Sequence, residues 1–118
     1  MAVGLDLDQY HFVKRVVLVF SPSGRDVRYE EQRLYLEDDT GEVDSWNLEV
    51  FGIFEDGPSF AAERALSREE AQAARERFGV EEGNFALYLL DLDGTSILRS
   101  DEPVPLDQLI DAIPEESG

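Results

Sequence analysis

The apolar residues of the chain fall into four runs that have the length and composition of β-strands. The first run is continuous and rich in β-branched residues, which is typical of a strand buried on both faces. The third is also almost wholly apolar, whereas the fourth mixes apolar and polar residues as an edge strand does. The predicted strands span residues 13–21, 48–54, 85–90 and 95–99. The Asp93-Gly94 pair predicts a hairpin turn between the last two strands. It does not predict a calcium loop, because such a loop needs more oxygen ligands at set positions and Thr95, Ser96 and Ile97 follow instead.

Three helices are predicted between and after these strands. Asp26 is the predicted N-cap of the first, which runs to about residue 39 and ends at Gly41. Ser67 and Glu70 form the capping-box pattern that opens the second, and Gly79 ends it. The third has a single apolar stripe at spacings of three and four residues, formed by Leu106, Leu109, Ile110 and Ile113.

The order of these elements is β-α-β-α-β-β-α, which indicates an α/β fold. A helix separates the first two strands, so we expect them to be parallel with a right-handed crossover. The last two strands should be antiparallel. The prediction is a mixed four-stranded sheet with helices on both faces, the succession found in the thioredoxin fold. The 118 residues suit one domain, which we place at 13–114, with an arm or extra strand at 1–12 and a tail at 115–118.

The charge balance narrows the choice of partners. The chain holds 27 Asp and Glu against 10 Lys and Arg, a formal net charge of −17. Such a charge repels the phosphates of nucleic acids and of anionic membranes, so we expect neither as a partner. Either the acidic surface docks a basic protein, or it keeps the protein soluble at high salt. The acids are spread along the chain rather than gathered in a tail, which favours salt adaptation, as in a halophilic bacterium.

The residue types that are absent or rare exclude several chemistries. The chain contains no cysteine and a single histidine, His11. Disulfides, thiolate metal sites and cysteine nucleophiles are thereby excluded, and we predict no metal and no cofactor. The N-terminus lacks a signal-peptide pattern. We therefore expect a cytoplasmic protein if Met1 is the native start, and a periplasmic or secreted one if a leader has been removed.

The C-terminal third carries a family resemblance. The segment from Phe85 to Pro114, FALYLLDLDGTSILRSDEPVPLDQLIDAIP, resembles the C-terminal half of the domain-of-unknown-function 4174 family (DUF 4174). The apolar strand after Arg15 and the Glu31-Gln32 pair are also similar to that family, so the resemblance covers most of the chain. It implies a thioredoxin-like fold and no established catalytic activity. The chain departs from the family pattern at Asp44-Ser45-Trp46-Asn47, where an Arg-Asp pair is usual, and after Pro114.

The turn after the first predicted strand, Ser21-Pro22-Ser23-Gly24-Arg25-Asp26, is the candidate ligand site. In redox thioredoxins this turn carries a Cys-x-x-Cys pair, and a cis-proline precedes the third strand. Here the turn has no cysteine and Gly83-Asn84 stands before the strand, so we expect no thiol–disulfide oxidoreductase. Ser21, Ser23 and Arg25 offer hydroxyls and a guanidinium to an anion beside a helix N-terminus. The competing interpretation is a capped turn with solvated polar residues.

Trp46 is the candidate contact for a protein partner. It stands in a polar segment, and tryptophan is enriched in binding hot spots. The alternative is that it covers the edge of the sheet. Taken together, the sequence predicts a non-catalytic binding or scaffold module. The alternative function is an enzyme or a small-anion-binding protein that uses the turn from Ser21 to Asp26.

Overall fold

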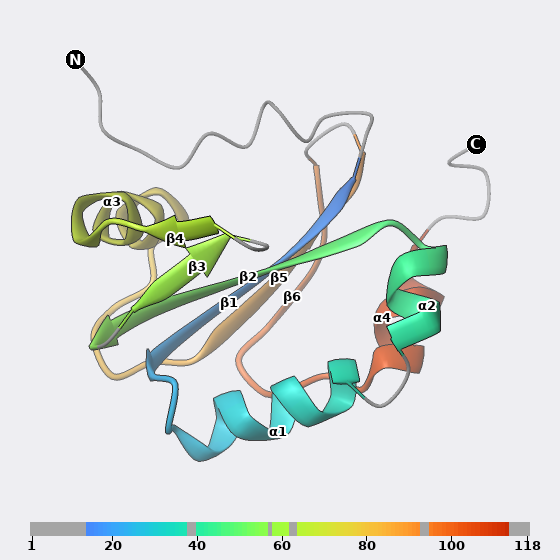
Figure 1. Ribbon diagram of the computed structural model, residues 1–118, viewed down its shortest axis with the longest axis horizontal. Coiled ribbons are helices and arrows are strands. Elements are labelled where there is room, and N and C mark those ends of the chain that lie inside the picture. The colour runs from blue at the N-terminus through green and yellow to red at the C-terminus, as the bar shows by residue number, and fades with distance from the viewer. Residues whose placement is uncertain (1–13, 38–39, 57, 62–63, 93–94, 114–118) are drawn as a thin grey trace.

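A mixed sheet forms the centre of the protein. The computed structural model describes residues 14–37, 40–56, 58–61, 64–92 and 95–113. Within these residues the sheet has six strands in the order β4-β3-β2-β1-β5-β6 (Figure 1). Their bounds are β1 (Arg15–Ser23), β2 (Leu48–Asp56), β3 (Ser59–Ala61), β4 (Arg64–Leu66), β5 (Ala86–Leu90) and β6 (Ser96–Ser100).

The strand pairing agrees with the predicted topology. Strands β1 and β2 are parallel, with Val17 opposite Val50, and every other pair in the sheet is antiparallel. Strand β6 is an edge strand, as its mixed pattern predicted. The turn at Asp93-Gly94 lies outside the described residues, and so do the predicted arm at 1–12 and tail at 115–118.

The prediction of four strands was wrong, because a short hairpin extends the sheet beyond β2. Strands β3 and β4 have three residues each. A strand of three residues is too short to show an alternating hydrophobic pattern, so nothing in the local sequence marks it. The hairpin places Phe60 opposite Gly52 on β2.

Four helices flank the sheet in the described residues: α1 (Val27–Glu37), α2 (Thr40–Ser45), α3 (Arg68–Phe78) and α4 (Leu106–Ala112). The capping box of Ser67 and Glu70 is present, and Gly79 ends α3 with a left-handed φ of 68°. Gly41 does not end the first helix, because α1 stops at Glu37 and Gly41 lies within α2. A lone glycine in a helix costs only about 1 kcal/mol relative to alanine.

The turn from α2 into β2 is made instead by Asn47, whose φ of 54° lies in the left-handed region that asparagine tolerates. The Asn47 carbonyl oxygen accepts a hydrogen bond from the Arg15 backbone N–H at 2.8 Å, which fixes the turn against the start of β1.

Two hydrophobic cores lie on opposite faces of the sheet. The side chains of β1 alternate between them: Val16, Leu18 and Phe20 pack toward α3, whereas Val17 and Val19 pack toward α1 and α4. In Figure 1, α3 lies beside one face and α1, α2 and α4 lie on the other side. Burial on both faces explains why the β1 sequence is an uninterrupted apolar run.

Candidate functional site

The ends of β1 and β2 define one edge of the sheet, which we call the carboxyl edge. Because the two strands are parallel, Ser23 and Asp56 end side by side there. Strand β5 runs antiparallel to β1, so the loop that precedes β5 reaches the same edge. Ligands of open α/β sheets favour this kind of edge, and the predicted ligand site lies on it.

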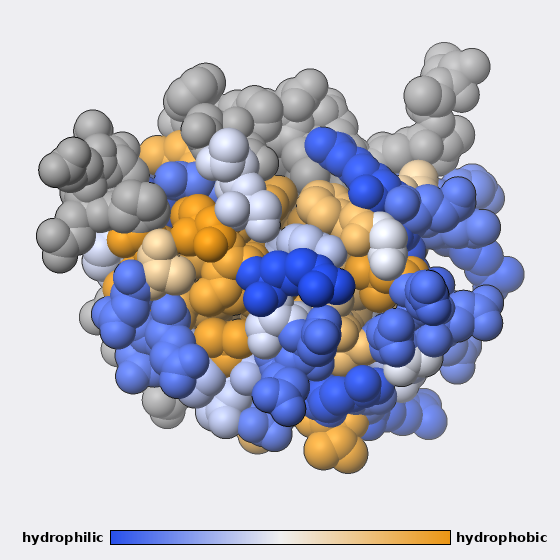
Figure 2. Space-filling view, turned by 180° about the vertical axis from the view of Figure 1, so that it is seen from behind, coloured by the Kyte–Doolittle hydropathy of each residue, from blue (hydrophilic) through white to orange (hydrophobic). Residues whose placement is uncertain are grey.

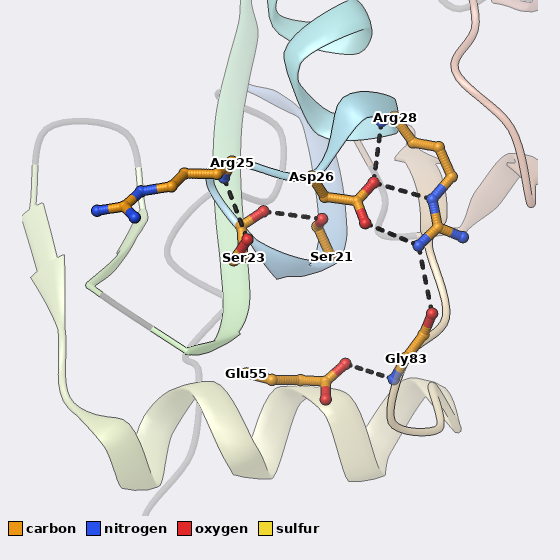
Figure 3. Close-up of polar contacts among 7 residues, drawn as sticks. All are labelled: Ser21, Ser23, Arg25, Asp26, Arg28, Glu55 and Gly83. Atoms are coloured by element: carbon orange, nitrogen blue, oxygen red, sulfur yellow. Dashed lines mark hydrogen bonds and ion pairs between the residues drawn. The ribbon is translucent and has the colours of Figure 1, made fainter.

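The three predicted ligand residues lie close together, but Ser21 and Ser23 end β1 and only Arg25 lies in the turn that follows. Ser21 is 1% exposed, and its hydroxyl donates to the Ser23 carbonyl oxygen at 3.0 Å. The Ser23 hydroxyl oxygen accepts from the Arg25 backbone N–H at 3.2 Å. The Arg25 side chain is exposed, and Figure 3 shows its guanidinium extending away from both serines. The hydroxyls therefore stabilise the turn, while the guanidinium faces solvent.

Asp26 occupies the N-terminus of α1. Its Oδ1 atom accepts from the Arg28 backbone N–H at 2.9 Å, which agrees with the predicted N-cap. The Arg28 guanidinium also donates to both carboxylate oxygens, from Nε and Nη2, at 2.9 Å each. These side-chain hydrogen bonds are the main cause that lowers the pKa of Asp26. A carboxylate thus already stands where an anion would meet the helix dipole.

Arg28 continues this contact across the carboxyl edge. Its Nη2 atom donates to the Gly83 carbonyl oxygen at 3.3 Å. The Gly83 backbone N–H donates to Oε2 of Glu55 at 2.7 Å, and the same oxygen lies 3.4 Å from Nη2 of Arg75 on α3. We call the five residues Asp26, Arg28, Gly83, Glu55 and Arg75 the edge network; Figure 3 shows the first four.

The edge network was not found by sequence reasoning. Its members come from the start of α1, from β2, from α3 and from the loop before β5. Asp26 was predicted as an N-cap, but nothing in the sequence links it to the other members. Gly83 has a φ of 81°, a conformation that side chains disfavour.

A polar hollow of about 510 Å³ lies next to the edge network. Its walls come from the end of β2, from β3 and from α3, and they include Glu55, Ser59, Arg68 and Arg75. The described residues hold no group of three or more His, Cys, Asp or Glu side chains suited to a metal ion. His11 lies outside the described residues.

Trp46 lies at the opposite end of β1 from the serines. Its ring is half-buried, and the Arg15 guanidinium carbon lies 6.0 Å from the ring centroid. Arg15 also donates to the Trp46 carbonyl oxygen at 3.1 Å and to Oδ1 of Asp91 at 3.2 Å. The Arg15 side chain is 8% exposed, so this ion pair is largely shielded from solvent. The structure therefore separates the two predicted sites.

Gln32, from the Glu31-Gln32 pair that is similar to the family, has a clear structural role. It is fully buried in α1, and its amide forms two hydrogen bonds with the backbone of Val104. It thereby ties α1 to the segment that precedes α4. No helix in the described part of the chain is long and apolar enough to cross a membrane.

Comparisons with known proteins place this geometry in a wider context. The fold is similar to that of a reduced 2-Cys peroxiredoxin from Plasmodium vivax, with a TM-score of 0.66 and 16% sequence identity over 92% of this chain and 80% of that chain. At such identity the likeness concerns the fold alone, which is thioredoxin-like. A comparison with curated proteins gave no match.

A family model agrees with the resemblance found in the sequence. The model for the domain of unknown function DUF4174 matches residues 6–115, nearly the whole chain. The match includes both the carboxyl edge and the Gln32 contact, so neither is an addition from outside the domain. The chain belongs to the DUF4174 family.

Proposed function

We propose that this domain is a binding module for another protein, built on a thioredoxin-like fold that works without thiol chemistry. The observation that supports this proposal is the edge network. Its donors and acceptors bond to one another across the edge where redox thioredoxins hold their cysteines. An edge closed in this way offers a rigid surface rather than a reactive group.

The lack of cysteine separates this chain from its structural neighbour. That protein is described as a 2-Cys peroxiredoxin, whereas the 118 residues here contain no cysteine. Ser21 and Ser23 lie at the end of β1, and Ser21 is buried. A serine hydroxyl does not exchange disulfides, so the proposed activity is binding and not redox transfer.

The charge and Trp46 support a partner of a particular kind. The net charge of −17 favours partners with a basic surface, through long-range attraction. Figure 2, which shows the molecule from behind relative to Figure 1, has hydrophilic side chains over much of this face, with hydrophobic ones exposed between them. Trp46 is the proposed anchor, because contact with Arg15 already fixes its ring and lowers the entropy lost on binding. The same acidity supports adaptation to salt.

Affinity capture from the source organism's lysate, at that organism's own salt concentration, tests this proposal. We expect one near-stoichiometric protein, identified by mass spectrometry, whose binding weakens at least tenfold in Trp46→Ala. Leu34→Ala, which removes an exposed apolar side chain from α1, is the matched control and should keep the partner. Absence of any partner would contradict the proposal, and circular dichroism would check that Trp46→Ala remains folded.

One observation favours the alternative function, a small-anion-binding protein or an enzyme at the turn. Among the described residues the Arg25 guanidinium has no ion-pair partner, unlike that of Arg28. Under this alternative, inorganic phosphate would shift the backbone NMR signals of the turn. The Ser23→Ala/Arg25→Ala variant would abolish that shift, whereas it would leave the capture of a protein partner unchanged.

A further inference from the structure

A second hollow of about 320 Å³ lies on the other side of the sheet from α3. We call it the α1–α2 pocket. Its floor comes from Val19, Val50 and Phe60 on neighbouring strands, and its sides from Leu36 on α1 and Val43 on α2. This wall is almost wholly apolar, in contrast to the polar hollow at the carboxyl edge. Small-molecule sites have this character and reach this size.

Gly52 shapes the floor of the α1–α2 pocket. A Cβ atom at this position would lie 2.4 Å from Cε1 of Phe60, so the Phe60 ring occupies the place of the missing side chain. The ring therefore lies against β2 as part of the wall. Because Val19 is opposite Gly52 and Val17 is opposite Val50, the adjacent strands present these apolar side chains on one face.

The polar groups around the pocket divide into occupied and available ones. Both polar atoms of the Gln32 amide are already bonded to Val104, and the side chain is fully buried. Tyr29 also lines the pocket, and its hydroxyl forms no hydrogen bond within the described residues. Burial is the main cause that raises the pKa of Tyr29, so the hydroxyl is neutral at pH 7 and both donates and accepts.

The mouth of the pocket carries Arg33 and Glu37, which form an ion pair at 2.9 Å. The two charges of this pair nearly cancel. The electrostatic field of the rest of the protein therefore determines whether a cation or an anion is favoured at the mouth. Glu37 is the last residue of α1, and the last turn has no basic residue to offset the negative end of the helix dipole. The whole chain adds a net charge of −17. A cation is therefore favoured at the mouth and an anion is disfavoured.

We propose that the α1–α2 pocket binds small amphiphilic cations: an ammonium group on an apolar body that fills the pocket. At roughly 30 Å³ for each water-sized group, 320 Å³ holds about ten non-hydrogen atoms. The apolar body contacts Val50 and Phe60, and the ammonium group lies beside Glu37 at the end of α1. This site is separate from the carboxyl edge and independent of the proposed protein partner.

Three probes of nearly equal size and different charge test the proposal: 2-phenylethylamine, 2-phenylethanol and phenylacetate. In NMR titrations of the full chain, the amine should bind most tightly, the alcohol less tightly and the carboxylate most weakly. We expect the affinity to fall two- to fivefold at each step. The shifted amide signals should belong to the residues that line the pocket. Equal binding of the three probes, a reversed order, or no binding of the amine would overturn the proposal.

Two charge variants of opposite sign provide the sharper test. Glu37→Gln leaves Arg33 unpaired and should weaken amine binding, whereas Arg33→Gln leaves Glu37 unpaired and should strengthen it. Each variant should change the ratio of amine affinity to alcohol affinity two- to fivefold. Glu31→Gln removes one charge from α1 outside the pocket wall and should change this ratio far less. Equal effects of Glu37→Gln and Glu31→Gln would mean that the net charge of the protein alone causes the preference for the amine, and this result would overturn the proposed site.

A filling variant tests the cavity itself. Val50→Phe should abolish binding of all three probes, and Val43→Phe on α2 serves the same purpose if Val50→Phe does not fold. Unchanged binding in a folded variant would overturn the proposal. So would amine binding that appears only after residues 1–13 are deleted, or a dimer that Val50→Phe converts to a monomer in sedimentation. Those two results would assign the pocket to this chain's own N-terminal segment or to a second copy.

Discussion

Replacing Gln32 should destabilise the protein more than any other change of a single polar side chain in α1. Its Nε2 atom donates to the Val104 carbonyl oxygen at 2.9 Å, and its Oε1 atom accepts from the Val104 N–H at 2.6 Å. Gln32 is 0% exposed and Val104 is 7% exposed, so water does not readily replace the amide. These two bonds join segments 72 residues apart in the sequence.

The magnitude follows from the two backbone groups that would be left unpaired. A buried N–H or carbonyl without a partner costs roughly 1–3 kcal/mol, so the two groups cost roughly 2–6 kcal/mol in Gln32→Leu. Burial of the leucine returns part of that loss, and we expect a net decrease of about 3 kcal/mol in the free energy of unfolding. Urea denaturation with a constant m-value measures it, and Gln72→Leu on the exposed side of α3 is the control. A loss below about 1 kcal/mol would refute the reasoning.

The Gln32→Glu variant checks the same contact through its pH dependence. A carboxylate at this position still accepts from the Val104 N–H, but its second oxygen faces the Val104 carbonyl. Burial and that oxygen raise the pKa of the introduced carboxyl above its ordinary value. The protonated acid donates as the amide does, so stability is highest below the unfolded pKa and is lost as pH rises through the raised folded pKa. Wild type lacks this titration, and a variant that gains stability relative to wild type with rising pH would contradict the assignment.

Three further predictions concern other parts of the molecule. Gly52→Ala places a methyl group 2.4 Å from the Phe60 ring, so we expect a loss of about 1–3 kcal/mol in urea denaturation, and a smaller loss in a Phe60→Ala background. The pKa of Asp26 is lowered chiefly by hydrogen bonds from Arg28, so its stabilisation is present above the unfolded pKa and is lost as pH falls through the folded pKa. Below about pH 4, the free energy of unfolding should therefore decrease more in wild type than in the Asp26→Asn variant. The net charge of −17 predicts a Tm that rises between dilute buffer and molar KCl, and a constant Tm would count against salt adaptation.

The fold could be predicted wherever the signal is local. The apolar run of β1, the capping box at Ser67 and the left-handed Gly79 each depend on a few neighbouring residues, and each was confirmed. The β3–β4 hairpin could not be predicted, because strands of three residues have no measurable period. Gly41 does not end the first helix for a related reason. A glycine at the end of a helix typically adopts a left-handed conformation, whereas Gly41 has no positive φ and lies within α2.

The site depends on contacts that no local pattern encodes. Sequence reasoning located the turn that holds Ser21, Ser23 and Arg25, and their role as a ligand site stays a prediction. The partners across the edge, Glu55 and Arg75, were not found. The chain has 27 acidic residues, and nothing in the sequence distinguishes Glu55, whose carboxylate accepts from Gly83, from the others. Only the packing of the strands against α3 shows this contact.

The loop before β5 closes the edge network through the backbone of Gly83. Redox thioredoxins place a cis-proline in this loop, next to their cysteines. Here Gly83 uses both of its backbone polar groups, since its N–H donates to Glu55 and its carbonyl accepts from Arg28. A proline at this position would have no N–H to donate, and its ring cannot adopt the observed φ of 81°. A proline at position 83 is therefore incompatible with the contacts that close the edge through Arg28 and Glu55. Gly83→Pro should accordingly open the edge network without creating any part of a redox site.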